Sequence, residues 1–281
     1  KKLNNAGLSI SPDIPVANSY YFYSSPLDHD LVIDSNNNIH IIWLGSSNGL
    51  IYYKKLNNNG VNLTSASIIT NYGSGNYRRP SIVADSMGNI HLTYLQSGSW
   101  NIANAILYKK LDNNGNNLTS ETVITYSWTE GFDRLQIAAD SNGNLHIAYN
   151  RYYNCGSFTC FDTIYTKLAI NGSIMYSSSL GYGSNPSIAV DNEHSAHIVF
   201  SEYPTSAGSN FEIKYAEVNS SGSVLVSDKR LTYDISYSEN ADISIDSNNN
   251  AHIIWQDTRD GNSEIYYKRS FTPIKMTGTP S

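Results

Sequence analysis

The sequence predicts an all-β protein, a five-bladed β-propeller built from four-stranded antiparallel blades. The first observation is a motif that occurs five times: an Asp after an apolar run, a polar turn, a His, and an aromatic residue three positions later. The second is its spacing of 51, 55, 51 and 55 residues, which is slightly longer than a propeller blade of roughly 40–50 residues and far from helical repeats of about 33–34. The motif residues are Asp34, Asp85, Asp140, Asp191 and Asp246; His40, His91, His146, His197 and His252; and Trp43, Tyr94, Tyr149, Phe200 and Trp255.

The third observation is that each copy contains four short runs of strand composition. In the second copy they span residues 81–85, 90–94, 105–109 and 121–125, with Asn-Gly and similar turns between them. Four such runs per copy are typical of a blade, and no stretch has the periodicity of a useful amphipathic helix. We expect one domain over residues 1–281, with blades at about 30–70, 80–126, 134–180, 186–233, and 241–271 together with 1–17.

The chain ends predict how the ring closes. The fifth copy runs out after residues 264–268 into Thr272-Pro273, whereas residues 1–5 and 8–11 resemble the end of a third strand and a fourth strand without a blade of their own. We therefore expect the N-terminal strand to complete the fifth blade, which would protect strand edges that are otherwise exposed. If the chain is part of a longer array, the number of blades is larger.

The composition indicates a secreted protein. Charged residues make up only 15% of the chain, and there are 22 Tyr; Tyr packs on pleated sheets, while the abundant Asn, Ser and Gly fill turns. A net charge of −6 with scattered Lys argues against a nucleic-acid partner. No run approaches the roughly 18–20 apolar residues of a membrane span. The start at Lys1 without a signal pattern predicts a mature product or an excised domain.

The two cysteines, Cys155 and Cys160, are separated by four residues. Two thiols cannot fill a tetrahedral zinc site, and no His is near in sequence, so a disulfide is favoured over free thiols or a metal. A disulfide indicates an oxidising compartment and an extracellular or cell-surface location. Four Asn-x-Ser/Thr triplets predict a glycoprotein, at Asn62, Asn117, Asn171 and Asn219.

The repeated Asp and His are interpreted as structural rather than catalytic or metal-binding, although a ring of five of each leaves a metal as the alternative. A catalytic arrangement is normally asymmetric, and these residues recur in every copy. We expect each Asp to accept hydrogen bonds from the amides of its own turn, and each His to bond a neighbouring turn or strand. The repeated aromatics and the aliphatic residue three before each Asp are predicted core: Leu31, Ile82, Ile137, Ile188 and Ile243.

The loops predict which face carries function. The turns after the first and third strand of each copy are nearly constant, whereas the other connections differ in length and are rich in Tyr, Trp and Asn. Varied loops on a constant scaffold are where binding sites are found, although these aromatic residues could instead pack together and cap the ring. The predicted ligand-binding residues are Arg79, Arg134, Trp100, Trp128, Tyr72, Tyr77, Tyr152, Tyr203, Asp28 and Asn240.

Two positions of each first strand are expected to surround the mouth of the central channel. If the protein is an enzyme, Asp30 and Asp242 on adjacent blades are the candidate carboxylate pair, with Glu130 or Glu239 as the acid. Arg79 and Arg134 could bind an acidic sugar or a carboxylate of a partner. Six positions before each motif Asp, the residues are Asp28, Arg79, Arg134, Asn185 and Asn240; four positions before it, they are Asp30, Ser81, Gln136, Ser187 and Asp242.

The pattern Asp-Ser-Asn-Gly-Asn-x-His-Ile-x-Trp, followed by Ile-Tyr-Tyr-Lys, resembles the sialidase-like (BNR-like) repeat propellers of microbial, including archaeal, cell surfaces. The resemblance covers the whole chain and implies a secreted propeller. The Ser-x-Asp-x-Gly-x-x-Trp box of true sialidases is not matched, because the turn here lies between the first two strands and carries a His. The count of five blades is similar, by fold alone, to tachylectin-2-type lectins and arabinanase-like glycosidases.

The favoured function is an extracellular binding, adhesion or surface-assembly module, lectin-like in recognising a glycan or a cell-surface protein through the varied loops. One alternative is a polysaccharide hydrolase or lyase with carboxylates at the channel mouth. Another is a structural subunit of a surface layer, filament or coat, by self-assembly. No cofactor is expected; calcium stays open because Asp-rich turns can build oxygen cages, although no twelve-residue EF-type loop is present.

Overall fold

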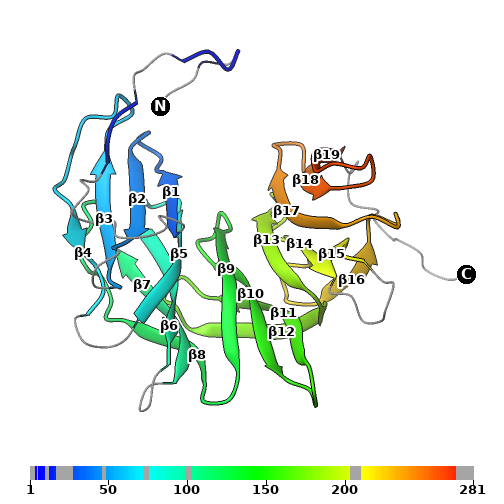
Figure 1. Cartoon of the computed structure of the whole chain (residues 1–281). Coiled ribbons are helices and arrows are strands. Elements are labelled where there is room, and N and C mark those ends of the chain that lie inside the picture. Colours follow the sequence, from blue (N-terminus) through cyan, green and yellow to red (C-terminus); the bar gives the residue numbers. More distant parts are fainter. Residues whose placement is uncertain are drawn as a thin grey trace, which may run out of the picture. The chain divides into compact units, whose positions relative to one another are not determined.

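The computed structural model describes residues 4, 6–9, 13–16, 28–45, 49–71, 76–98, 103–202 and 210–269 (Figure 1). These ranges contain nineteen β-strands and no helix, which confirms the all-β prediction. The chain divides into two compact units, residues 1–137 and 138–281. Both are built from antiparallel sheets in which each strand pairs with the next along the chain.

The first unit contains two complete four-stranded blades. The first strand of one blade, β1, contacts the first strand of the next, β5. The first blade comprises β1 (His29–Ile33), β2 (Ile39–Leu44), β3 (Ile51–Leu56) and β4 (Ser67–Ile68), and the second β5 (Asn76–Ala84), β6 (Ile90–Ser97), β7 (Asn104–Leu111) and β8 (Thr122–Ser127).

The third blade begins with β9 (Gly131–Ala139), at the boundary between the units, and the second unit holds the rest. Five sheets in series confirm the five-bladed propeller, and the fifth has three strands among the described residues. The strands are β10 (Leu145–Asn154), β11 (Thr159–Leu168) and β12 (Ile174–Tyr182); β13 (Ser184–Val190), β14 (Ala196–Glu202), β15 (Glu212–Val218) and β16 (Val224–Arg230); and β17 (Ser238–Ile245), β18 (Ala251–Asp257) and β19 (Glu264–Arg269).

The described part of the N-terminal segment packs on the first blade. Lys54 Nζ donates to the carbonyl oxygen of Val16 at 2.9 Å. Lys109, at the same position of the second blade, donates to Ile69 O, just after the last strand of the blade before it. The carbonyl oxygen of Val16 therefore takes the same place next to the first blade that the carbonyl oxygen of Ile69 takes next to the second. The predicted closing strand over residues 1–17 lies largely outside the described residues and stays a prediction.

Each blade contains the same hydrogen-bond chain, which is partly exposed in the fifth blade and which we call the Asp–His–Tyr chain. In the second blade, Asp85 Oδ1 accepts from the amides of Met87 at 2.9 Å and Asn89 at 2.8 Å. Its Oδ2 lies 3.1 Å from His91 Nε2, and His91 Nδ1 lies 2.9 Å from the Tyr108 hydroxyl. The same contacts recur for Asp34–His40–Tyr53, Asp140–His146–Tyr165, Asp191–His197–Tyr215 and Asp246–His252–Tyr267.

These contacts confirm the structural interpretation of the repeated Asp and His. The environment of the two groups also favours an ionised Asp and a neutral His. Burial opposes ionisation of Asp85, but hydrogen bonds from Asn89 and His91 outweigh it and lower the pKa of the carboxyl. Burial also lowers the pKa of His91, against the opposing effect of Asp85. A neutral ring beside a carboxylate donates from Nε2 and accepts from the Tyr hydroxyl at Nδ1.

In four blades a Lys or Arg side chain lies near the Asp of the Asp–His–Tyr chain. The closest is Lys167, whose Nζ lies 3.6 Å from Asp140 Oδ2. In the fourth blade Glu217 stands at this position and accepts from the Tyr215 hydroxyl at 3.1 Å. The other three distances are 3.8 Å for Lys55–Asp34, 3.7 Å for Lys110–Asp85 and 3.7 Å for Arg269–Asp246.

The predicted core is largely confirmed. All five motif aromatics are buried, and so are four of the five aliphatic residues three positions before the Asp. Leu31 is the exception, with 55% of its surface exposed against 5% for its equivalent Ile82. Ile82 lies in β5, which contacts β1 and β2 of the first blade.

We predict that Tyr108→Phe destabilises the fold by about 1–3 kcal/mol, because it leaves His91 Nδ1 buried without a donor. Tyr267→Phe is the matched control, since the side chain of His252 is 34% exposed and water can replace the hydroxyl. Urea unfolding of both variants measures the difference. Equal losses would contradict the assignment of a buried donor to Tyr108.

We also predict that stability falls continuously on acidification. His40, His91 and His146 have lowered pKa values in the folded state. Below the unfolded value near 6.5 the unfolded chain therefore binds more protons, and stability decreases as the pH falls. The motif Asp residues, also lowered, extend the loss below about pH 3.9. Urea midpoints between pH 8 and pH 4 test this; stability that rises from pH 7 to pH 5 would refute it.

Candidate functional site

Four first strands carry an unusual residue at the same position, six before the motif Asp. Arg79, Arg134, Asn185 and Asn240 have φ angles of 52°, 52°, 53° and 55°. Left-handed backbone is uncommon outside glycine. The pairing register shifts around three of them, as expected for β-bulges, which redirect side chains. We call these residues, together with Asp28 at the same position of the first blade and the five residues two positions later, the rim.

In the first unit, the rim forms an ion network around Arg79. Its Nε donates to Asp133 Oδ1 at 3.0 Å, and its Nη1 lies 3.3 Å from Asp28 Oδ1. The Arg79 amide also donates to Asp28 Oδ2 at 3.0 Å. Arg134 is different: its Nε lies 4.0 Å from Asp133 Oδ2, and 47% of its side chain is exposed. Arg79 therefore joins strands, while Arg134 presents a guanidinium to solvent.

Asp30 lies two residues beyond Asp28 and is held in a fixed orientation. Its Oδ2 accepts from Ser81 Oγ and from the Ile82 amide, both at 3.0 Å, and its Oδ1 accepts from the Leu31 amide at 2.8 Å. Burial nevertheless dominates over these bonds and raises the pKa of Asp30. A carboxyl with a raised pKa keeps its proton closer to neutral pH than an ordinary Asp does.

The rim of the second unit is less charged. Asn185 Nδ2 donates to Asn240 Oδ1 at 3.0 Å, and Ser187 Oγ donates to Asp242 Oδ1 at 2.5 Å. Asp242 is exposed. Because Asp30 and Asp242 belong to different units, their predicted pairing stays a prediction.

The two predicted acids lie on different elements. Glu239 lies in β17, next to Asn240. The backbone oxygen of Glu130 accepts from Asn104 Nδ2 at 3.0 Å, which anchors the connection before β9. Neither observation tests a role of Glu239 or Glu130 in catalysis.

The predicted aromatic residues are in different environments. Trp128 is 65% exposed, and Tyr152 is half-buried beside Phe161. The prediction that Tyr77 lies in an exposed loop is wrong. Tyr77 belongs to β5, is 1% exposed and packs edge to face on Tyr94. Tyr72, Trp100 and Tyr203 lie outside the described residues.

The predicted disulfide is confirmed. Cys155 and Cys160 are bonded at the tip of the β10–β11 hairpin. In the described ranges no group of three or more His, Cys, Asp or Glu side chains is arranged to hold a metal, so calcium stays an open expectation. The same ranges contain no helix long and apolar enough to cross a membrane. Three predicted glycosylation sites, Asn62, Asn117 and Asn171, are exposed, and Asn219 is half-buried.

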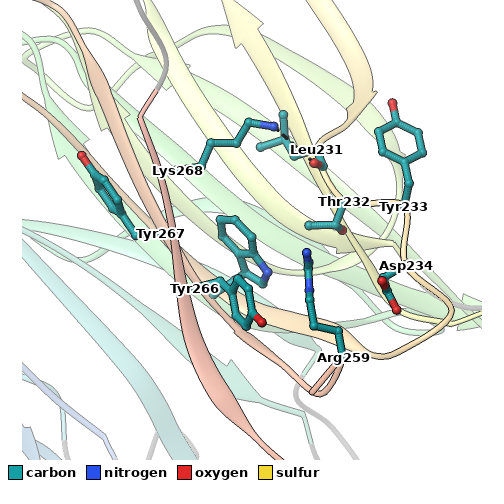
Figure 2. A pocket seen from close by; sticks show the side chains of 9 residues that line it. Leu231, Thr232, Tyr233, Asp234, Arg259, Tyr266, Tyr267 and Lys268 are labelled. Atoms are coloured by element: carbon teal, nitrogen blue, oxygen red, sulfur yellow. Dashed lines mark hydrogen bonds between the residues drawn. The ribbon is translucent and has the colours of Figure 1, made fainter. Parts of the chain in front are cut away.

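The structure adds a cleft that sequence reasoning missed. It has a volume of about 490 Å³ and lies in the second unit between residues 231–234 and strands β18 and β19 (Figure 2). Trp255 and Arg259 line it. The loop after β18 was recognised as varied, but Trp255 was interpreted only as core, and which side chains converge depends on tertiary structure.

Comparison with known proteins gives a fold but no family. No family model and no curated protein matches the chain. One similar solved structure is a polysaccharide lyase of family PL25, an ulvan lyase bound to -[GlcA(1-4)Rha3S]-, with a TM-score of 0.57, 10% identity, and coverage of 85% of this chain and 66% of that one. This chain therefore spans slightly less than two thirds of the lyase. An α-L-arabinofuranosidase from Fusarium graminearum has a TM-score of 0.58, 9% identity, and coverage of 86% and 76%.

The two arginines of the rim, Arg79 and Arg134, allow a matched pair of substitutions. Arg79→Met should destabilise the fold by about 1–3 kcal/mol, because it leaves the largely buried Asp28 carboxylate without its ion pair. Arg134→Met, at the same backbone conformation, should change stability by less than about 0.5 kcal/mol. Thermal and urea unfolding compare the two. A similar loss in both variants would mean that Arg134 also joins strands.

Proposed function

We propose that this protein acts on polysaccharides, binding a glycan chain at the rim of the varied-loop face and cleaving it there by hydrolysis or elimination. The observation that carries the proposal is the grouping of Asp30, Arg79 and Arg134 on neighbouring first strands. The fold is shared with a polysaccharide lyase and an α-L-arabinofuranosidase, which supports cleavage at least as well as binding alone. At about 10% identity, the chemistry has to be argued from this chain's own residues.

Asp30 is the proposed proton donor. Its raised pKa favours the protonated form that a general acid needs, and its fixed hydrogen bonds orient it. Glycoside hydrolysis uses a second carboxylate about 5–10 Å away. We keep Asp242 as the proposed second carboxylate, and Glu130 and Glu239 as alternatives, to be separated by assay of each variant.

Arg134 is the proposed recognition residue for an acidic sugar. Its side chain is 47% exposed and its Nε lies 4.0 Å from Asp133, so the guanidinium can donate two hydrogen bonds to a carboxylate of the ligand. Asp28 and Asp133 already engage Arg79, which leaves that residue to position the strands. A uronate-containing polysaccharide is therefore the favoured substrate class.

Binding without cleavage is the second candidate. Trp128, just after β8, is 65% exposed, and Tyr126, near the end of β8, is 64% exposed; their rings could stack on sugars. Adhesion to a cell-surface protein, or self-assembly in a surface layer, filament or coat, remains a further proposal. The disulfide is consistent with the extracellular location that all of these need.

We predict that Asp30→Asn lowers turnover of a uronate polysaccharide about 10²–10⁴-fold while the fold stays intact, because the amide cannot donate the proton of a carboxylic acid. Reducing-end release detects cleavage by either route, and the absorbance of unsaturated uronate identifies elimination. Glu193→Gln, an exposed change on the constant turns, is the control. Undiminished turnover in Asp30→Asn would exclude Asp30, and glycan binding by a wild-type chain that cleaves nothing would favour the second candidate.

A further inference from the structure

We propose that Glu212, the first residue of β15, is a pH-sensitive switch at the varied-loop end of the fourth blade. The folded blade holds this carboxyl in its protonated form, and loss of the proton as the pH rises loosens the adjacent part of the rim. That part is the first half of β17, residues 238–242. The inference goes beyond the proposed function, because it concerns the order of the rim whatever the rim binds.

Glu212 lies directly opposite a second carboxyl. In the antiparallel pairing of β14 with β15 its partner is Glu202, in the pair of residues next to the connection between the two strands. Direct cross-strand partners have Cβ atoms about 4.5–5.5 Å apart, and like charges at such positions are destabilising. In the third blade the same two positions hold Arg151 and Asp162, whose Nη2 and Oδ2 atoms are 2.6 Å apart. The fourth blade therefore has two acids where the third has an ion pair.

Two cations near this pair of acids are bound to Glu202. Lys214 Nζ lies 3.0 Å from Glu202 Oε1, and Arg230 Nη2 contacts Glu202 Oε2. Lys214 Nζ also lies 2.5 Å from Asp228 Oδ1. The ion pairs with Lys214 and Arg230 outweigh burial and lower the pKa of Glu202. Glu202 is therefore the ionised member of the pair, and its negative charge opposes ionisation of Glu212.

Glu212 itself is buried with little to balance a charge. It is 4% exposed, and among the described residues its Oε2 atom has no hydrogen-bond partner. Burial is the main cause that raises the pKa of Glu212. The charges of Glu202 and Asp257 add to this effect, whereas a hydrogen bond from Thr232 and the charge of Arg230 oppose it. A buried carboxylate without a full set of partners costs far more than the neutral acid, so the protonated form is favoured.

The residue before each of the two acids bonds the first half of β17. Ser201 Oγ accepts from the Asn240 amide at 3.2 Å, and the Phe211 carbonyl oxygen accepts from the Ser238 amide at 2.9 Å. Asn240 is the left-handed residue of this part of the rim. A second negative charge between β14 and β15 would separate the ends of these strands, and with them the two groups that hold the rim in place.

The direction of the pH effect follows from the raised pKa of Glu212. Above the ordinary Glu value near 4.5, an open segment releases this proton while the closed segment retains it. Opening is therefore increasingly favoured as the pH rises. The lowered pKa values of His40, His91 and His146 act on global stability in the opposite direction, but these residues belong to the first three blades. Local exchange at the rim therefore reports on Glu212 more directly than global unfolding does.

The test is amide hydrogen exchange of the full chain between pH 5 and pH 8, corrected for the intrinsic exchange rate at each pH. In the wild type, the protection of the Ser238 and Asn240 amides should fall about tenfold over this range, because a buried charge without partners favours opening. Glu212→Gln cannot ionise at this position. Its protection should stay nearly constant and should exceed that of the wild type about tenfold at pH 8.

Glu264→Gln is the matched control. Glu264 occupies the same position in the fifth blade, opposite Asp257, but it is exposed and its Oε1 accepts from Asn262 Nδ2 at 3.0 Å. This change should leave the exchange of residues 238 and 240 as in the wild type. Carbon-13 titration of the Glu212 carboxyl in the wild type measures its protonation directly, even if Glu212→Gln folds poorly.

Three outcomes would overturn the inference. The Glu212 carboxyl titrates near 4.5 like an ordinary Glu; Glu212→Gln shows the same pH dependence of exchange as the wild type; or this variant is less protected than the wild type at pH 8, which would mean that an ionised Glu212 stabilises the blade. None of these measurements uses a glycan, so their failure leaves the proposed function, which the Asp30→Asn assay tests, unaffected.

Discussion

The Asp–His–Tyr hydrogen-bond chain is the constraint on which every blade depends. One carboxylate closes the turn between the first two strands, orients a His on the second strand, and through it a Tyr on the third. Because these groups are buried, the partners must all be present or each would carry a desolvation cost. The chain therefore fixes the relative position of three strands at one end of each sheet, and leaves the opposite end free to vary.

That freedom is visible at the rim. Four blades share the same left-handed residue, yet two place an Arg there and two an Asn. The backbone is thus repeated while the chemistry is not: the first unit forms an ion network around Arg79, and the second uses amide and hydroxyl contacts. A common backbone that presents different side chains is how one scaffold can carry different chemistry in different blades.

The sequence predicted the blades, the core and the disulfide because each has a local signature: a period, an alternation or a short loop. Tyr77 was misassigned because its run is polar and Gly-rich just before it, although β5 extends through it into the core. The partners of Asp30 and the cleft residues could not be predicted, since they meet across strands far apart in sequence. Arg259 is one example, because only the fold brings it against Tyr266 and beside residues 231–234.

The hydrogen bonds from Asp to His to Tyr all close within one blade. A stretch of DNA encoding a blade could therefore be duplicated and inserted with this hydrogen-bond chain already satisfied, while contacts between blades, such as that of Lys109 with the Ile69 carbonyl oxygen, would have to form again with a new neighbour. This makes copying a low-risk route for the lineage to gain blades. Divergence could then begin at the opposite end of the newest copy, without first repairing its interior.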